Sequence, residues 1–379
     1  MELNSYFNDF LSKIRPTDNQ NDDYRQGYKT LRRRLWSDPD LKKIIVATFI
    51  QGSYRRSTAI RPQGDKRADV DLVVVTRLSQ DEYTPQKAMD VFVPFLEAHY
   101  AGKYKPNARS FAIELSYVDL DLVITSAPSE SQIAVFQSEA IDSELTPEDY
   151  HELILPDSVI RLSEAVLKAG LDWEKAASEP GWKSEPLHIP DRERKQWQRT
   201  HPLAQIEWTW GKNKATNYHY VNVVKALKWW RWIMYPEAKY PKGYPLEHII
   251  GSCCPDGIES VAAGVVFTLE GITTCFQSEG KNHQTPWLSD HGVPEHNVFA
   301  RVSGDDFAAL YSQVKAAAAI ARNAYNLEDL EESAEEWKKL FGSKFPSPVN
   351  RDSAKDAVIT VGGYTPREDI SEIRGGRFG

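Results

Sequence analysis

The sequence predicts an α/β domain with a mixed sheet, followed by a mainly helical domain. Three observations lead to this prediction. The first part of the chain alternates apolar runs of strand period with segments of helical period. Beyond about residue 150 the helical period dominates. The length of 379 residues suits about two domains, because a domain usually takes roughly 100–200 residues.

The elements of the first domain follow from local pattern. The opening segment places Phe10, Leu11 and Ile14 at helical spacing. A β-branched run then stops at Gly52 and Ser53, as a buried strand does before a tight turn. The expected order is a helical segment over 2–43, a strand over 44–50, a strand over 69–76, a helix over 85–100 and one or two strands over 111–125.

The second domain is read mainly as helices. The clearest covers 219–235, and a longer one covers 305–341 with a possible break near Asn326. A loop that contains Pro and Trp is expected near 179–190. The end of the chain is rich in Pro, Gly, Ser and charge, which is typical of a mobile tail. The expected limits are therefore 1–150 for the first domain, 151–345 for the helical domain and 346–379 for the tail.

Composition excludes several classes of protein. A net charge of −8 argues against wrapping a long nucleic acid, which needs many Lys and Arg contacts to phosphates. No apolar stretch approaches the roughly 20 residues of a membrane span, and the N-terminus lacks a secretory pattern, so we expect a cytoplasmic protein. Three cysteines are too few for a disulfide framework or a four-ligand zinc site.

The strongest chemical signal is a pair of acids on one strand. Side chains alternate along a strand, so Asp69 and Asp71 project from the same face. Two adjacent carboxylates suit hard cations, and a pair of Mg²⁺ ions can stabilise both oxygens of an in-line phosphoryl transfer. A phosphate cradle is also present, because Gly52 allows close backbone approach to a triphosphate and the Ser53 hydroxyl can donate to its oxygens.

A third carboxylate is expected on the strand that follows. Two candidates, Asp119 and Asp121, share a face there. We favour Asp121, because it directly precedes an apolar run as Asp71 does. Asp119 stays open as the alternative, with Glu114 next.

At this point the sequence resembles a known family, the bacterial cGAS/DncV-like nucleotidyltransferases, or CD-NTases, which are related to oligoadenylate synthases. The segment Gly52-Ser-Tyr-Arg-Arg-Ser-Thr-Ala-Ile with Asp69-Val-Asp-Leu-Val resembles their catalytic motif. The stretch from Val223 through Lys228-Trp-Trp, followed by Lys242-Gly-Tyr244-Pro-Leu-Glu247, is similar to their helical domain. The resemblance implies a polymerase-β-like nucleotidyltransferase domain with a mixed sheet plus an oligoadenylate-synthase-like helical domain.

The resemblance also implies roles for single residues. Gly52 and Ser53 would hold the triphosphate, and Lys228 would contact the donor phosphates. Tyr244 would stack on a base. Asp69, Asp71 and Asp121 would bind two Mg²⁺ ions, and Asp121 would help to remove the proton of the attacking hydroxyl.

The implied function is synthesis of a cyclic oligonucleotide signal, cyclic AMP-AMP-GMP, from ATP and GTP in anti-phage defence (CBASS), where the product activates a downstream effector. The implied partners include an E1/E2-like conjugating enzyme acting on the C-terminal Gly379, or a HORMA-type regulator. No nucleic-acid template and no membrane are expected. The alternatives are a linear oligonucleotide synthase, an RNA-end nucleotidyltransferase, an antibiotic- or protein-modifying nucleotidyltransferase, and an inactive nucleotide-binding sensor.

Overall fold

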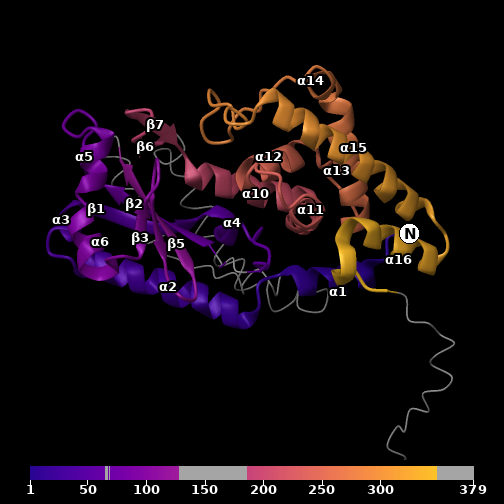
Figure 1. Ribbon diagram of the computed structural model, residues 1–379, viewed down its shortest axis with the longest axis horizontal. Helices are drawn as coiled ribbons and strands as arrows, with labels where there is room; N and C mark the ends of the chain where they lie inside the picture. Colours follow the sequence, from indigo (N-terminus) through magenta and orange to yellow (C-terminus); the bar gives the residue numbers. More distant parts are fainter. Residues whose placement is uncertain (65–66, 68, 128–185, 348–379) are drawn as a thin grey trace, which may run out of the picture.

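The computed structural model describes residues 1–64, 67, 69–127 and 186–347. A sheet lobe and a helical lobe lie side by side, with α4 (Gly52–Arg55) between them (Figure 1). The predicted tail with Gly379 lies outside the described residues, as does much of the stretch on either side of residue 150. The expected domain limits therefore stay predictions.

The sheet lobe is built on a seven-stranded mixed sheet, as the sequence predicted. Strands β2 and β5 run parallel in its centre, and the other pairs are antiparallel. The order is β1-β2-β5-β4-β3, with β6 joined to β5 and β7 to β6. The strands are β1 (Ile45–Gln51), β2 (Asp69–Thr76), β3 (Tyr104–Pro106), β4 (Phe111–Glu114), β5 (Asp119–Ser126), β6 (Leu187–Asp191) and β7 (Gln196–Thr200).

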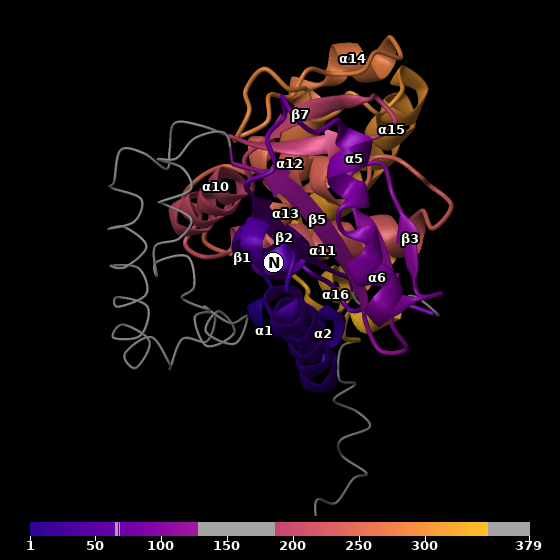
Figure 2. The same cartoon turned by 90° about the vertical axis from the view of Figure 1, so that its left-hand side faces the viewer.

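Both faces of the sheet are covered, which explains why its central strands are apolar in almost continuous runs. Val70, Leu72 and Val74 pack on one face in a cluster that includes residues of α2 (Asp18–Ser37), α5 (Pro85–Asp90) and α6 (Val93–Tyr100). Val73 and Val75 point to the other face and pack against α10 (Pro202–Ala215). The short α3 (Leu41–Ile44) leads into β1. Figure 2 views this sheet with the helical lobe behind it.

The helical lobe is assembled from both ends of the described chain. Its core joins α1 (Asn4–Ile14) to helices that follow more than 200 residues later, and the N-terminus lies beside α16 (Figure 1). Phe7 packs edge-on against Trp337 with ring centroids 5.0 Å apart. The other helices are α11 (Tyr220–Met234), α12 (Gly243–Cys253), α13 (Val261–Cys275), α14 (Gln277–Lys281), α15 (Gly304–Asn326), α16 (Leu330–Phe341) and the 3₁₀ turn Gly342–Lys344.

Several expected elements are divided or extended in the structure. The helical segment predicted over 2–43 is three helices, because Pro16 ends the first and Thr17 caps the second. The helix predicted over 85–100 is also broken, whereas the expected break near Asn326 is confirmed. The loop predicted near 179–190 was wrong at its described end, where residues 187–190 begin a hairpin that extends the sheet.

None of the helices within the described ranges is long and apolar enough to cross a membrane.

Candidate active site

The acidic residues predicted from the sequence meet where three strands end or begin. Strands β2 and β5 start there in parallel, with Asp69 paired to Asp119 and Asp71 paired to Asp121 across the ladder. Strand β1 ends at the same edge, with Gln51 opposite Asp71. Because alternate residues share a face of a strand, all four carboxylates project from the face that continues toward α10.

These carboxylates are crowded enough to resist losing their protons. Desolvation and then the charges of Asp71 and Asp121 raise the pKa of Asp69 above its ordinary range. Asp69 is exposed at the start of β2, so contact with water reduces the effect of desolvation on its pKa. The repulsion from Asp71 and Asp121 remains. Desolvation and the charge of Asp121 raise the pKa of Asp71 to about 6, although Arg56 opposes this. The site therefore holds more negative charge than its surroundings balance.

The two candidates for the third acid have different partners. Asp119 forms an ion pair with Arg67, with Nε 2.8 Å from Oδ1. Asp121 instead accepts long hydrogen bonds from Ser110 Oγ at 3.4 Å and Asn107 Nδ2 at 3.5 Å. Desolvation, the largest influence, raises the pKa of Asp121. Asp121 is thus the carboxylate left to face Asp71, whereas the charge of Asp119 is already balanced.

The turn after β1 brings its backbone directly against the acids. Gly52 has φ 76°, a conformation that costs glycine little. A Cβ atom there would lie 1.8 Å from Asp71 Oδ2, so no other residue fits without displacing that carboxylate. The next residue, Ser53, is half-buried, and its carbonyl accepts the N–H groups of Thr58 and Ala59 at 2.9 and 3.1 Å. These bonds close the turn that follows β1.

Lys228 reaches this turn from the helical lobe. Its Nζ donates to the carbonyl of Thr58 at 2.9 Å and to Glu247 Oε1 at 2.8 Å. Its side chain is 13% exposed, so it is not a surface lysine. The predicted phosphate contact is therefore placed within reach of the turn that carries Gly52 and Ser53.

Tyr244, the predicted base-stacking residue, lies next to the same group of charges. The guanidinium carbon of Arg56 is 5.2 Å from the centre of its ring. Its hydroxyl donates to Asp290 Oδ2 at 3.0 Å, and Asp290 also accepts from Gln205 and from the backbone N–H of Gly292. The side chain of Tyr244 is thus held by Arg56 over its ring and by Asp290 at its hydroxyl.

The sequence reasoning missed the buried ion cluster that links these two residues to the turn. Glu247 accepts from Arg56 Nε at 3.2 Å and from Thr58 Oγ1 at 2.9 Å, in addition to Lys228. Arg56 is 7% exposed, so its guanidinium is part of this buried cluster. A signal was available, because Arg56 lies three residues after Ser53 in the same motif and Glu247 closes the tyrosine motif.

A divalent cation suits the acidic edge of the site. Within the described ranges no three His, Cys, Asp or Glu side chains converge closely enough to hold an ion by themselves. The donors present are nevertheless those that Mg²⁺ prefers, namely carboxylate oxygens. Burial, and then the charges of neighbouring carboxylates, raise the pKa values of Asp69 and Asp71, and a bound cation would offset both effects. Nucleotide phosphates would supply further oxygen ligands, as is usual for Mg²⁺.

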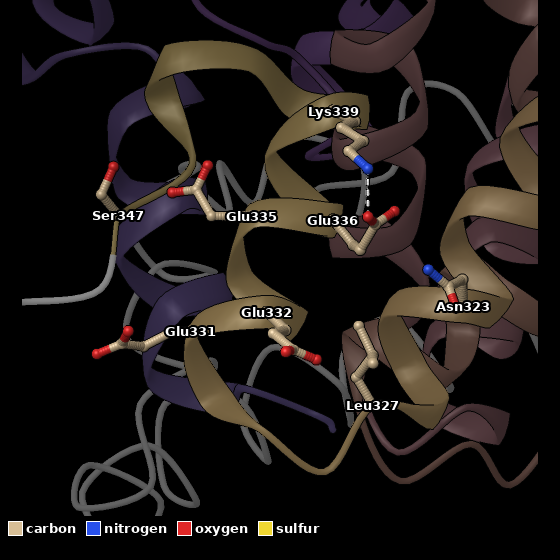
Figure 3. A pocket seen from close by; sticks show the side chains of 8 residues that line it. All are labelled: Asn323, Leu327, Glu331, Glu332, Glu335, Glu336, Lys339 and Ser347. Carbon is tan, nitrogen blue, oxygen red and sulfur yellow. Dashed lines mark hydrogen bonds and ion pairs between the residues drawn. The ribbon is translucent and has the colours of Figure 1, made fainter.

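A separate pocket between α15 and α16 does not share this chemistry. Four glutamates line it, with Asn323, Leu327, Lys339 and Ser347 (Figure 3). Its lysine is paired with Glu336, so the lining stays strongly negative and would repel a phosphate. None of the residues predicted from the sequence lies in it.

Comparison with known proteins adds to this geometry. The family described as "Second Messenger Oligonucleotide or Dinucleotide Synthetase domain" matches residues 1–132. The chain is 45% identical to the cyclic AMP-AMP-GMP synthase of Enterobacter hormaechei and 46% identical to a probable cyclic AMP-AMP-GMP nucleotide synthase of Salmonella paratyphi B. Both alignments cover 100% of this chain and 100% of the relative.

The fold is also similar to solved structures. The CdnC protein of E. coli MS115-1, in its complex with a HORMA protein, matches with a TM-score of 0.61 at 17% identity. That match covers 91% of this chain and 99% of the other. At so low an identity, the likeness shows that the two proteins share a fold.

Proposed function

This chain belongs to the CD-NTase family of second-messenger oligonucleotide synthetases, and from that premise we propose that it joins two ATP and one GTP into cyclic AMP-AMP-GMP. It is a nucleotidyltransferase, and ATP and GTP are its substrates. The full-length identity to two synthases of this product is what carries the assignment of the product.

The observation that supports the chemistry is the meeting of Asp69, Asp71 and Asp121 with the turn at Gly52. In each transfer a ribose hydroxyl oxygen bonds to the α-phosphorus of a nucleoside triphosphate. The bond from that phosphorus to the bridging oxygen breaks, and pyrophosphate leaves. Two such steps build a linear trinucleotide and a third closes the ring, so three pyrophosphates are released for each product.

The residues divide this work by position. Asp69, Asp71 and Asp121 would hold two Mg²⁺ ions, which supply charge stabilisation to the attacking and leaving oxygens when bound. Asp121 would also help to remove the proton of the attacking hydroxyl, a step that metal coordination would assist. The Ser53 hydroxyl and Lys228 would donate to the triphosphate, and Tyr244 would stack on a base.

The direct test is incubation of the purified protein with ATP, GTP and Mg²⁺. We expect a product that resists phosphatase and has the mass of a cyclic trinucleotide of two adenylates and one guanylate, and we expect EDTA to stop its formation. A ladder of phosphatase-sensitive products would instead mean linear extension. Nucleotide binding without turnover would mean a sensor, and either result would overturn the proposal.

We further propose that the C-terminal Gly379 is a conjugation site for an E1/E2-like enzyme. This residue lies outside the described part of the chain, and the proposal rests on the Gly-Gly-Arg-Phe-Gly ending. Deletion of Gly379 is expected to leave synthesis by the purified enzyme unchanged while it abolishes conjugation and phage protection in cells. If the deletion variant protects cells as well as the wild type does, regulation lies elsewhere, and a HORMA-type partner becomes the next candidate.

A further inference from the structure

The buried cluster around Glu247 lies at the contact between the two lobes. Glu247 comes from α12 and Lys228 from α11, whereas Arg56 and Thr58 belong to the turn after β1. The side chains of Glu247 and Arg56 are 5% and 7% exposed, and Thr58 is fully buried. Two cations and one carboxylate thus connect the helical lobe to the catalytic turn.

Among the described residues, the hydrogen bonds of Lys228 use two of its N–H groups and leave the third uncommitted. A lysine ammonium has three N–H donors. One goes to the Thr58 carbonyl at 2.9 Å and one to Glu247 at 2.8 Å. The tetrahedral geometry of the ammonium then fixes the direction of the third. A flexible four-carbon side chain would otherwise lose much rotamer freedom on binding a phosphate, so a fixed amine is pre-organised for it.

Glu247 has the charge that this role requires. Burial by itself would raise its pKa, but the charges of Lys228 and Arg56 outweigh burial and hold the pKa of Glu247 below its ordinary value. The group therefore stays ionised at neutral pH. One negative and two positive charges leave a net positive cluster beside the turn, which suits a triphosphate.

We propose that Glu247 is a positioning residue that aims the third N–H of Lys228 at the donor triphosphate. The inference rests on the proposed function, because it takes a triphosphate as the ligand of Lys228. It assigns Glu247 no contact with substrate. Its effect on the reaction passes through the amine that it holds.

The test is a double-mutant cycle on kcat/KM for ATP with E247Q, K228M and the double variant. Glutamine keeps the shape of the side chain but removes its charge, and we expect E247Q to lower kcat/KM by about 10- to 100-fold. If Glu247 acts through Lys228, the double variant should lose no more than about threefold beyond K228M alone. Losses that multiply would overturn the proposal, and so would an E247Q enzyme as active as the wild type.

A matched control separates positioning from stability. Glu270 pairs with Arg322 through two hydrogen bonds of 2.5 and 2.7 Å between α13 and α15. E270Q also removes one carboxylate charge from an ion pair, and we expect its kcat/KM to match the wild type. Equal losses in E270Q and E247Q would mean a general structural effect and would overturn the proposal. Failure of the wild type itself to make product would instead overturn the proposed function.

Discussion

Two groups of charged residues adjoin the turn after β1, and they differ in whether their charges are balanced. At the edge of the sheet, Asp69, Asp71 and Asp121 lie together, and no ion pair to any of them is found among the described residues. At the contact between lobes, Glu247 is paired with both Arg56 and Lys228. The first group has raised carboxyl pKa values and the second a lowered one.

The difference indicates which of the two groups is expected to bind a ligand. An unbalanced cluster of carboxylates is costly unless cations arrive, so it marks the position where metal and nucleotide are expected to bind. A balanced buried cluster is costly to disturb but gains little from a ligand, so it marks the scaffold that holds binding groups in place. Four predictions test this division, in order of expected effect.

The largest effect is expected from removing two of the unbalanced charges. The variant with Asp69→Ala and Asp71→Ala should lose product formation by at least about 1000-fold, because its metal ligands are gone. Its thermal stability should be equal to or above that of the wild type, since two repelling charges are lost. Product yield by chromatography and unfolding by calorimetry check both parts. Turnover close to the wild type would refute the metal-site interpretation.

The next effect separates the two acids of β5. Asp121→Asn should reduce turnover by about 100-fold or more, whereas Asp119→Asn should change it by a few-fold at most, because Asp119 is already neutralised by Arg67. Initial rates at saturating Mg²⁺ measure both. A reversal of the order would place Asp119 at the metal, and mild effects at both would direct attention to Glu114.

A smaller effect is expected in the stability of the metal-free protein as pH changes. The pKa of Asp71 is about 6 in the folded protein against an ordinary value of 3.8, so the folded state binds more protons than the unfolded state between these values. The contribution of Asp71 to stability therefore falls as pH rises through this window. We expect Mg²⁺ to raise Tm by a few degrees at pH 7 and to flatten this dependence. D71N should show a smaller slope and a smaller rise in Tm with Mg²⁺, and a wild type with no slope in EDTA would contradict the prediction.

The smallest effect concerns Lys225, a buried cation of the helical lobe whose charge is not balanced as the charges around Glu247 are. Lys225 is buried one helical turn before Lys228, with no ion pair among the described residues, and burial followed by the charges of Arg15 and Lys228 lowers its pKa well below the ordinary value. Lys225→Met should thus raise Tm by a few degrees at pH 7. The gain should shrink as pH approaches 10.5, because the unfolded lysine then also loses its proton. A lower Tm for this variant would mean that Lys225 stabilises the fold through contacts of its alkyl chain.

The elements that the sequence predicted well are those that depend on local pattern. The apolar runs of β1, β2 and β5 and the turn at Gly52 follow from β-branched residues and from glycine, and the structure confirms them. The sequence did not predict the hairpin of β6 and β7, because Pro190 and a run of polar residues are unusual in strands. Its pairing with β5 is also long-range. The position of α1 in the helical lobe was also beyond local reasoning.

The candidate site divides in the same way. Strand alternation was enough to put Asp69 and Asp71 on one face, and the parallel register that sets Asp121 beside Asp71 needed the structure. The partners of Glu247 are 19 and 191 residues away along the chain. Helix and strand periodicities relate only residues a few positions apart. The ion cluster could therefore be recognised only from the three-dimensional structure.

The packing of α1 against α16 also sets an order of events in folding. Phe7 and Phe10 are buried among Trp337, Phe341 and Phe345, which are translated more than 300 residues later. At roughly 5–20 residues per second, the ribosome takes on the order of 20 to 70 s to make that distance. During this interval the apolar face of α1 has none of these partners, and the core of the helical lobe stays open. The nascent chain is therefore most exposed to aggregation and to chaperones just before α16 is complete.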